Sequence, residues 1–390
     1  MKKILFDLRG CQPNRESKFH GGGVYGYIVL KSLIKQAPDR IIVYYDSKRF
    51  VAPDVEQMMT DNNIEKVDSN EKGLPQCIKD NDIRTFYSPL FNKSYKQLLG
   101  LDIPIIITIH GLRNLEMNRD ETEILYIRSL RDKVKALLKQ TPYYGHLLKK
   151  YWEDKKWLFE NENVQIITVS NHSKHSIMYY YPFVDEKRIE VMYSVSTTPE
   201  GYENTKPYSS DKYYLIVSAN RWLKNAYRAI KAFDNLFDNP QFGVDGKVIV
   251  LGLSKETSIY KRIKHKERFE LMGYVDQDTL ESLYKGAYAL VYPSLNEGFG
   301  YPPLEAMKYG TPVIASPFAS VTEICGNAVL YANPYSIEEI ANRILQMENQ
   351  SIRSSFCHKG LERYTFIANK QAADLDKLCL ILLGEKKGSR

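Results

Sequence analysis

Three patterns are absent from this sequence of 390 residues, and each absence narrows the class of protein. No apolar run approaches the roughly 20 residues that a helix needs to cross a bilayer, so we expect no membrane-spanning helix. The first residues, MKKILFDLRG, contain no signal-peptide core and no cleavage site, and we expect them to form a strand. No internal repeat or low-complexity tract is evident. With 43% hydrophobic residues, the chain is expected to fold into a globular core.

Cysteine is scarce and scattered. The five cysteines form no CxxC pair and no even set for disulfides: Cys11, Cys77, Cys325, Cys357 and Cys379. Such usage suits a reducing compartment, so we expect a cytoplasmic protein.

Acidic residues are fewer than basic ones, which leaves a net charge of +7 and favours anionic partners. Lysines and arginines concentrate in residues 128–157, interleaved with Tyr143, Tyr144, Tyr151 and Trp152. Two interpretations stay open for this segment: a solvated helical face, or a patch that meets anionic lipid headgroups at the inner face of the plasma membrane. We expect no nucleic-acid binding, because no recognised module motif accompanies the charge.

Short β-branched runs alternate with helical stretches along the whole chain. The expected strands are KKILFDL, RIIVYYD, IPIIITIH, VQIITVS, YYLIVSA, KVIVLGL, ALVYPS and TPVIAS. Near-continuous apolar strands separated by helices indicate parallel sheets covered on both faces, the doubly wound α/β class. Such sheets bind ligands at the carboxyl ends of their strands.

The chain is longer than one hydrophobic core usually allows, so two domains are expected. The polar stretch 197–211, rich in proline and serine, is the best linker between them. We therefore predict two Rossmann-like domains facing each other across a cleft, 1–200 and 201–365, followed by a terminal segment, 366–390.

The stretch SLNEGFGYPPLEAMKYGTPVIAS, 294–316, combines a glycine loop, two prolines and two glutamates. Pro302 and Pro303 suit the first turn of a helix. Glu305 then lies in the first helical turn, where bare backbone amides can bind anions or sugar oxygens. Glu297 lies on the preceding loop, so the two carboxylates can accept hydrogen bonds from different hydroxyls of one ligand. A simpler interpretation, interaction with the helix dipole, accounts for Glu305 alone.

This stretch resembles the E-x7-E signature of the retaining GT-B glycosyltransferases of family 4, the glycosyl transferases group 1 family. The spacing, the loop glycines, the proline and the following Gly-x-Pro-Val all coincide. The resemblance implies that Glu297 faces the donor sugar and that Glu305 holds the nucleotide ribose. It also implies that Phe299, Gly300 and Tyr301 lie against the sugar and diphosphate.

The terminal segment, 366–390, resembles the C-terminal helix that in this family crosses back onto the N-terminal domain. Three other segments are similar to the same family. VSANRWLKN, 217–225, resembles its diphosphate clamp and would supply Arg221 and Lys224, although the two cations are closer together here than in many members. HGGGVYGYIVLKSL, 20–33, resembles its first-domain glycine loop, with Gly22 and Gly23 approaching the donor phosphate. His110, at the end of IIITIHGL, resembles its strand-terminal histidine near the reacting sugar; a lone histidine is otherwise more often a packed residue.

No metal or other cofactor is expected. DND at 80–82 and DQD at 276–278 match a metal motif of another transferase class, but the second has helix-cap spacing from Asp278 to Glu281. His172 and His175 are one helical turn apart without an evident third ligand.

The expected function is therefore retaining transfer of a hexose from a nucleotide-diphosphate sugar to a saccharide acceptor. The GFGYPPLEAM variant favours GDP-mannose or a dTDP-linked sugar, and UDP-sugars stay open. A lipid-linked acceptor in bacterial O-antigen or surface-polysaccharide synthesis would explain the basic, aromatic segment 128–157. The alternatives are a non-catalytic GT-B nucleotide-sugar-binding protein, and a nucleotide-sugar epimerase or hydrolase on the same fold.

Overall fold

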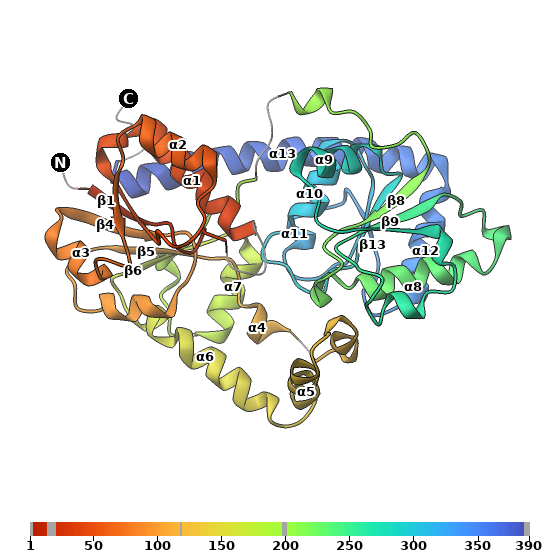
Figure 1. The fold of residues 1–390 in the computed structure, drawn as a ribbon, viewed down its shortest axis with the longest axis horizontal. Coiled ribbons are helices and arrows are strands. Elements are labelled where there is room, and N and C mark those ends of the chain that lie inside the picture. Colours follow the sequence, from red (N-terminus) through yellow and green to blue (C-terminus); the bar gives the residue numbers. More distant parts are fainter. Residues whose placement is uncertain (1–2, 14–20, 118, 197–200, 386–390) are drawn as a thin grey trace. The chain divides into compact units, whose positions relative to one another are not determined.

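The computed structural model describes residues 3–13, 21–117, 119–196 and 201–385. The chain divides into two compact units. Unit 1 comprises Met1–Leu115, Lys150–Thr197 and Ala368–Arg390; unit 2 comprises Glu116–Lys149 and Thr198–Ile367. Each unit is built around one parallel sheet (Figure 1).

The sheet of unit 1 has the strand order β3-β2-β1-β4-β5-β6-β7, and its described pairs are all parallel. The order reverses between β1 and β4, which makes their carboxyl ends the switch point where such sheets bind ligands. The strands are β1 (Lys3–Asp7), β2 (Ile41–Tyr45), β3 (Glu65–Asp68), β4 (Ile83–Ser88), β5 (Ile105–Ile109), β6 (Val164–Thr168) and β7 (Ile189–Val191).

Helices cover the faces of this sheet, so β5 is buried at every residue and β4 at all but Arg84. One core cluster joins β1 and β2 to α1, α2 and the end of α13, and Figure 1 shows these helices on one side of the sheet. Phe159 of α6 stacks on Tyr181, which follows α7, at 4.1 Å between ring centroids. The helices named here are α1 (Gly21–Gln36), α2 (Pro53–Asp61), α3 (Leu74–Asp80), α4 (Arg113–Glu116), α6 (Tyr144–Glu160), α7 (Asn171–Tyr180) and α13 (Gln350–Leu383).

Unit 2 repeats the pattern with the strand order β10-β9-β8-β11-β12-β13, again parallel in every described pair. Its order reverses between β8 and β11. The strands are β8 (Tyr213–Ile216), β9 (Lys247–Leu251), β10 (Phe269–Met272), β11 (Ala289–Tyr292), β12 (Val313–Ala315) and β13 (Leu330–Tyr331).

The core of unit 2 lies where the sheet meets α8 and α12, and it contains Phe233, Ile230 and Ile344. The helix α10 begins right after the loop that follows β11, with Gly300 as its N-cap. The helices of this unit are α5 (Leu130–Lys139), α8 (Ala226–Phe237), α9 (Gln277–Gly286), α10 (Tyr301–Lys308), α11 (Val321–Cys325) and α12 (Ile337–Glu348).

The division differs from the predicted one in an internal segment. We predicted that all of 1–200 belongs to the first domain, whereas Glu116–Lys149 groups with unit 2. The physical reason is a set of contacts that tie this segment to α8 and its neighbours, beginning with the ion pair between Asp120 and Arg228. Leu125 and Tyr126 pack against the same core.

The end of α13 groups with unit 1, where Leu378, Cys379 and Leu382 enter the core. The carboxylate of Asp374 accepts a hydrogen bond from the backbone N–H of Tyr193 at 2.8 Å. Of the predicted linker and terminal segment, residues 197–200 and 386–390 lie outside the described residues.

All eight predicted strands are present, as β1, β2, β5, β6, β8, β9, β11 and β12. The prediction missed β3, β7, β10 and β13, which are short edge strands, and also β4. The sequence of β4, IRTFYS, mixes polar and aromatic residues, so its buried central position is not evident from its pattern.

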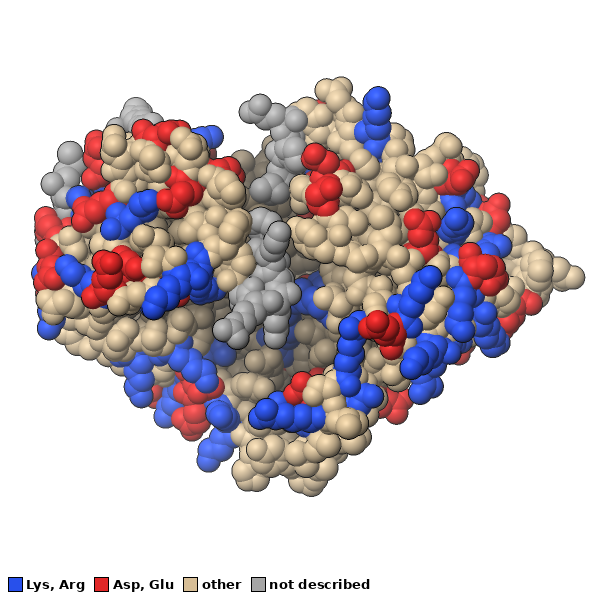
Figure 2. All heavy atoms as spheres, viewed as in Figure 1, with Lys and Arg blue, Asp and Glu red and all other residues tan. Residues whose placement is uncertain are grey.

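No helix within the described ranges is long and apolar enough to cross a membrane. Acidic and basic side chains are mixed over the viewed face of the molecule (Figure 2).

Candidate functional site

Two loops meet at the switch point of unit 2. One, 217–225, follows β8 and the other, 293–300, follows β11. The backbone N–H of Leu295 donates to the carbonyl of Leu223 at 2.8 Å, and Ser294 Oγ lies 3.1 Å from the same carbonyl. Asn225, which has a positive φ of 57°, donates from Nδ2 to the carbonyl of Pro293 at 3.0 Å. The two loops therefore form one hydrogen-bonded unit.

The loops bring Lys224 and Glu297 together. Lys224 Nζ lies 2.5 Å from Glu297 Oε1, and the two side chains are only 6% and 8% exposed. The same carboxylate oxygen accepts hydrogen bonds from Tyr292 OH at 2.6 Å and Ser294 Oγ at 2.5 Å. A buried ion pair with this many hydrogen bonds compensates the desolvation of both charges. It also fixes the position of the Glu297 carboxylate.

The pKa of Tyr292 depends on the charges of this cluster. Burial raises its pKa well above the usual value, and the adjacent Glu297 carboxylate raises it further. The nearby Arg221 charge opposes the shift. Arg221 itself is exposed at the N-cap of the 3-10 turn Trp222–Lys224. The site therefore combines one buried cation with an accessible one.

Glu305 lies in the second turn of α10 and not in the predicted first turn, because the helix begins at Tyr301, before the two prolines. Its side chain is half-buried. Burial raises the pKa of its carboxyl, and the negative charge of Glu281 adds to the shift. Tyr284, Lys308 and Lys224 oppose it. A half-buried carboxylate whose ionisation is disfavoured gains from any ligand that donates hydrogen bonds to it.

The glycine loop between Glu297 and Glu305 is held by hydrogen bonding from Ser320. Its buried Oγ lies 2.9 Å from the carbonyl of Glu297 and 2.9 Å from that of Phe299. Gly300 has a φ of 110°, a conformation that side chains disfavour, and it turns the chain into α10. The Phe299 and Tyr301 rings pack against each other at 5.4 Å. The backbone of this loop is thus held in one shape.

A second layer of contacts comes from the segment 116–126. Arg228 makes a two-pronged ion pair with Asp120, at 2.8 Å and 3.2 Å, and also donates to Asn225 Oδ1 at 3.0 Å. Asn296 Nδ2 donates to Glu116 Oε2 at 2.6 Å. Asn225 follows Lys224 in the sequence and Asn296 precedes Glu297, so these contacts help to fix the positions of the two charged residues.

The other predicted residues lie in unit 1. His110 follows β5, and its Nε2 is 2.9 Å from the carbonyl of Pro89. Gly22 lies in the first turn of α1, where an added Cβ would be 2.7 Å from Leu90. Gly23 is buried in the same turn. The loop that follows β4 therefore brings Gly22 and His110 into one neighbourhood.

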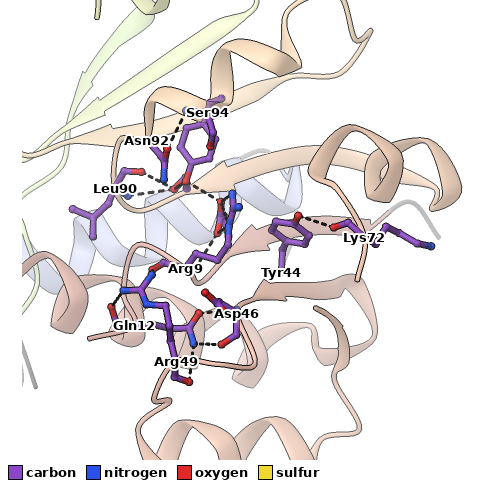
Figure 3. A network of polar contacts seen from close by, with 12 residues as sticks. Arg9, Gln12, Tyr44, Asp46, Arg49, Lys72, Leu90, Asn92 and Ser94 are labelled. Carbon is purple, nitrogen blue, oxygen red and sulfur yellow. Dashed lines mark hydrogen bonds and ion pairs between the residues drawn. The ribbon is translucent and has the colours of Figure 1, made fainter. Parts of the chain in front are cut away.

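The switch point of unit 1 holds a polar network, part of which Figure 3 shows. Buried Asp7, at the end of β1, pairs with Arg9 at 2.7 Å and accepts a hydrogen bond from Tyr95 OH at 2.9 Å. The guanidinium of Arg9 lies over the Tyr44 ring, 4.5 Å from its centroid. Gln12 joins this turn to the end of β2 through Asp46 (Figure 3). These contacts order the carboxyl ends of β1, β2 and β4.

The DQD motif caps a helix, but through a different aspartate from the one predicted. Asp276, rather than Asp278, is the N-cap of α9 and accepts from the Thr279 N–H at 2.8 Å. Glu281 does not complete a capping box, because it pairs with Lys308 at 2.5 Å. Within the described residues, no three His, Cys, Asp or Glu side chains are grouped to hold a metal ion.

Some residues of the site were missed from the sequence. Tyr292 and Ser294 belong to the predicted strand ALVYPS, and the polar residues at its end were a usable signal. Asn225 lies in the quoted VSANRWLKN stretch, and its positive φ is typical of asparagine. Ser320 and Asp120 carried no signal, because each reaches the site from a separate part of the chain.

Comparison with known proteins connects this geometry to a family. Residues 200–361 match the family model of "Glycosyl transferases group 1". They contain both loops of the site and α10.

Two curated relatives are similar to parts of the chain. The O-antigen chain mannosyltransferase RfbU of Salmonella typhimurium is 32% identical over 210 residues, which are 53% of this chain and 57% of that protein. The O-antigen chain mannosyltransferase B of Escherichia coli is 43% identical over 91 residues, 23% of this chain and 24% of that protein. The matched chain thus spans between about a quarter and somewhat over half of these relatives.

The fold is similar to solved structures over nearly the whole chain. The sucrose-phosphate synthase of Thermosynechococcus elongatus superposes with a TM-score of 0.68 at 14% identity, covering 98% of both chains. With its two parallel-sheet units, the chain has the GT-B fold.

Proposed function

We propose that the protein is a retaining GT-B glycosyltransferase of family 4. It transfers a hexose, mannose first among the candidates, from a nucleotide-diphosphate sugar to a saccharide acceptor. The observation that carries the proposal is the buried Lys224–Glu297 pair at the switch point of unit 2, beside the N-terminus of α10. The match of the surrounding residues to the group 1 family model supports the same conclusion.

The donor fits these residues by charge. Arg221 and Lys224 supply positive charge for the diphosphate, and the backbone from Phe299 to Tyr301 offers amide donors where α10 begins. Glu305 accepts hydrogen bonds from the ribose hydroxyls. Glu297, held by three donors on one oxygen, faces the sugar. His110, Gly22 and Gly23 keep the roles that the family resemblance implies.

The proposed reaction breaks the bond between the sugar C1 and the diphosphate oxygen. The acceptor hydroxyl forms the new C1–O bond on the same face, and its proton passes to the leaving phosphate. Positive charge near the leaving group stabilises the negative charge that develops there. No metal or further cofactor enters this proposal, since Arg221 and Lys224 supply that charge.

GDP-mannose is the first donor to test, because both curated relatives described above are named mannosyltransferases; dTDP- and UDP-linked sugars follow. The O-antigen role of the same relatives supports a lipid-linked acceptor in surface-polysaccharide synthesis, with the protein in the cytoplasm.

The test is transfer from each nucleotide sugar to lipid-linked saccharides extracted from bacterial membranes, followed by NMR of the new linkage. GDP-α-mannose should give an α-linked product and free GDP. A β-linked product would overturn retention, and hydrolysis or epimerisation without an acceptor would favour the alternative enzymes.

Two variants assign the chemistry. His110→Asn and Glu297→Gln should each lower kcat by about 100-fold, a typical loss for one group that stabilises the transition state. His358→Asn is the control, because His358 is an exposed residue of α13 whose side chain pairs with Glu362 of the same helix. Nucleotide-sugar binding by all variants together with no transfer by the wild type would instead indicate a binding protein.

A further inference from the structure

The helix α5 carries its apolar side chains on the outside. Leu130, Val134, Leu137 and Leu138 are 80%, 55%, 54% and 44% exposed. At 3.6 residues per turn, these positions share one face of the helix. Ala136 lies on the opposite side and is buried. An apolar face turned to solvent, with a small residue turned inward, is the reverse of an ordinary surface helix.

Cations border this apolar stripe on both sides. Lys133 falls along one edge by helical spacing, and Arg131 and Lys135 fall along the other. Among residues 128–143, five residues are basic and Asp132 is the only acidic one. Asp132 pairs with Lys135 at 2.7 Å, so the net positive charge along the stripe comes from Arg131 and Lys133. In Figure 2, the region that Figure 1 labels α5 shows uncharged side chains together with Lys or Arg and with Asp or Glu.

The helix is anchored rather than loosely attached. The preceding turn, Glu121–Tyr126, is held by the buried Asp120–Arg228 ion pair. Tyr126 OH accepts a hydrogen bond from the Tyr227 N–H at 2.8 Å, and Arg128 Nη2 donates to Ser254 Oγ at 2.7 Å. The stripe is therefore presented by the same unit that holds Lys224 and Glu297.

We propose that α5 is a membrane-docking helix that lies in the interface of an anionic bilayer. Leu130, Val134, Leu137 and Leu138 enter the acyl boundary, and the bordering cations contact anionic headgroups. The sign and arrangement of charge identify this occupant, since a copy of this basic face would repel it. The inference deepens the proposed function, on which it rests for its purpose: bringing the donor unit to a lipid-linked acceptor.

The experiment is flotation of the full chain with vesicles of phosphatidylcholine alone and of phosphatidylcholine with a quarter phosphatidylglycerol. The wild type should float with the anionic vesicles at low salt and be released at high salt. Replacing Leu130, Val134, Leu137 and Leu138 together by serine should abolish flotation. Replacing Arg131, Lys133 and Lys135 by glutamine should lower the partition coefficient by about fivefold per cation.

Phe242→Ser is the matched control, because this exposed apolar residue of unit 2 lies outside α5. The control should float like the wild type. Equal flotation of the stripe variant and the wild type would overturn the proposal. So would a wild type that ignores vesicles but dimerises through the stripe in light scattering. If the serine variant does not fold, the glutamine variant, which changes only the charged border, still decides the point.

Transfer to a soluble saccharide acceptor separates this inference from the proposed function. The stripe variant should retain that activity and lose activity toward acceptor embedded in vesicles. Vesicle binding with no transfer to any acceptor would contradict the proposed function and leave the docking helix standing.

Discussion

The Lys224–Glu297 pair predicts a strong energetic coupling that a double-mutant cycle can measure. Lys224→Met leaves a carboxylate buried beside Tyr292 and Ser294, and Glu297→Gln leaves an ammonium group without its counter-charge. Each single change should cost about 3 kcal/mol of unfolding free energy, because an uncompensated charge remains buried. The double variant removes both charges, so its total cost should also be about 3 kcal/mol. The coupling is then about 3 kcal/mol, at the upper end for residues in contact.

Hydrogen exchange of the β8 and β11 amides is the assay, since these strands carry the two loops and belong to one unit. Each single variant should exchange roughly 150-fold faster than the wild type at these strands, by the tenfold change per 1.4 kcal/mol. The double variant should exchange no faster than either single variant.

The surface pair Lys247–Glu270 is the control cycle. Its atoms are 3.9 Å apart and both side chains are largely accessible, so its coupling should stay below about 1 kcal/mol. Additive single effects at Lys224 and Glu297 would refute the argument that the two charges neutralise each other in a buried site.

Three further outcomes follow from the site. Glu305→Gln should raise the melting temperature of the ligand-free protein at pH 7 but not below pH 4.5. The folded-state pKa of Glu305 is raised, so the wild type loses stability as the pH rises from the unfolded value of about 4.5 through the folded value. The same substitution at an exposed residue, Glu256→Gln, is the control and should not reproduce this pH dependence. Ser320→Ala should destabilise unit 2 by about 1–2 kcal/mol in urea unfolding and raise KM for the nucleotide sugar, because the two loop carbonyls lose the single hydroxyl proton that they share; an unchanged KM would contradict its positioning role. Arg228→Met should speed hydrogen exchange across 119–126 while leaving β5 unchanged, since Asp120 would lose its partner; protection equal to the wild type would show that other contacts hold the segment.

The strands that carry the site were predictable because burial on both faces leaves a plain mark in the sequence. IIITI and ALVY are fully buried and read as continuous apolar runs. The edge strand β3 has the sequence EKVD and faces solvent, so its apolar content is too low to reveal it. The GFGYPPLEAM stretch likewise marks a loop and helix start, because proline and positive-φ glycine have few other positions.

What could not be predicted depends on contacts between distant parts of the chain. Residues 116–149 lie within the first half of the sequence, yet the Asp120–Arg228 pair joins positions 108 residues apart. The pairing of Lys224 with Glu297 spans 73 residues and follows only from the parallel neighbours β8 and β11. The basic, aromatic composition of 128–157 was evident, but the exposure of the leucines of α5 required the fold.

The most direct test of the donor site is a thermal-shift titration with GDP, UDP, dTDP and ADP. One of them, GDP by the mannosyltransferase argument, should stabilise the protein by about 2.7 kcal/mol at 100 times its Kd. Arg221→Gln should weaken that stabilisation without a folding cost, because Arg221 is exposed, and Lys255→Gln, also exposed, should not. Absence of stabilisation by all four nucleoside diphosphates would contradict the assignment of this site to a nucleotide-sugar donor.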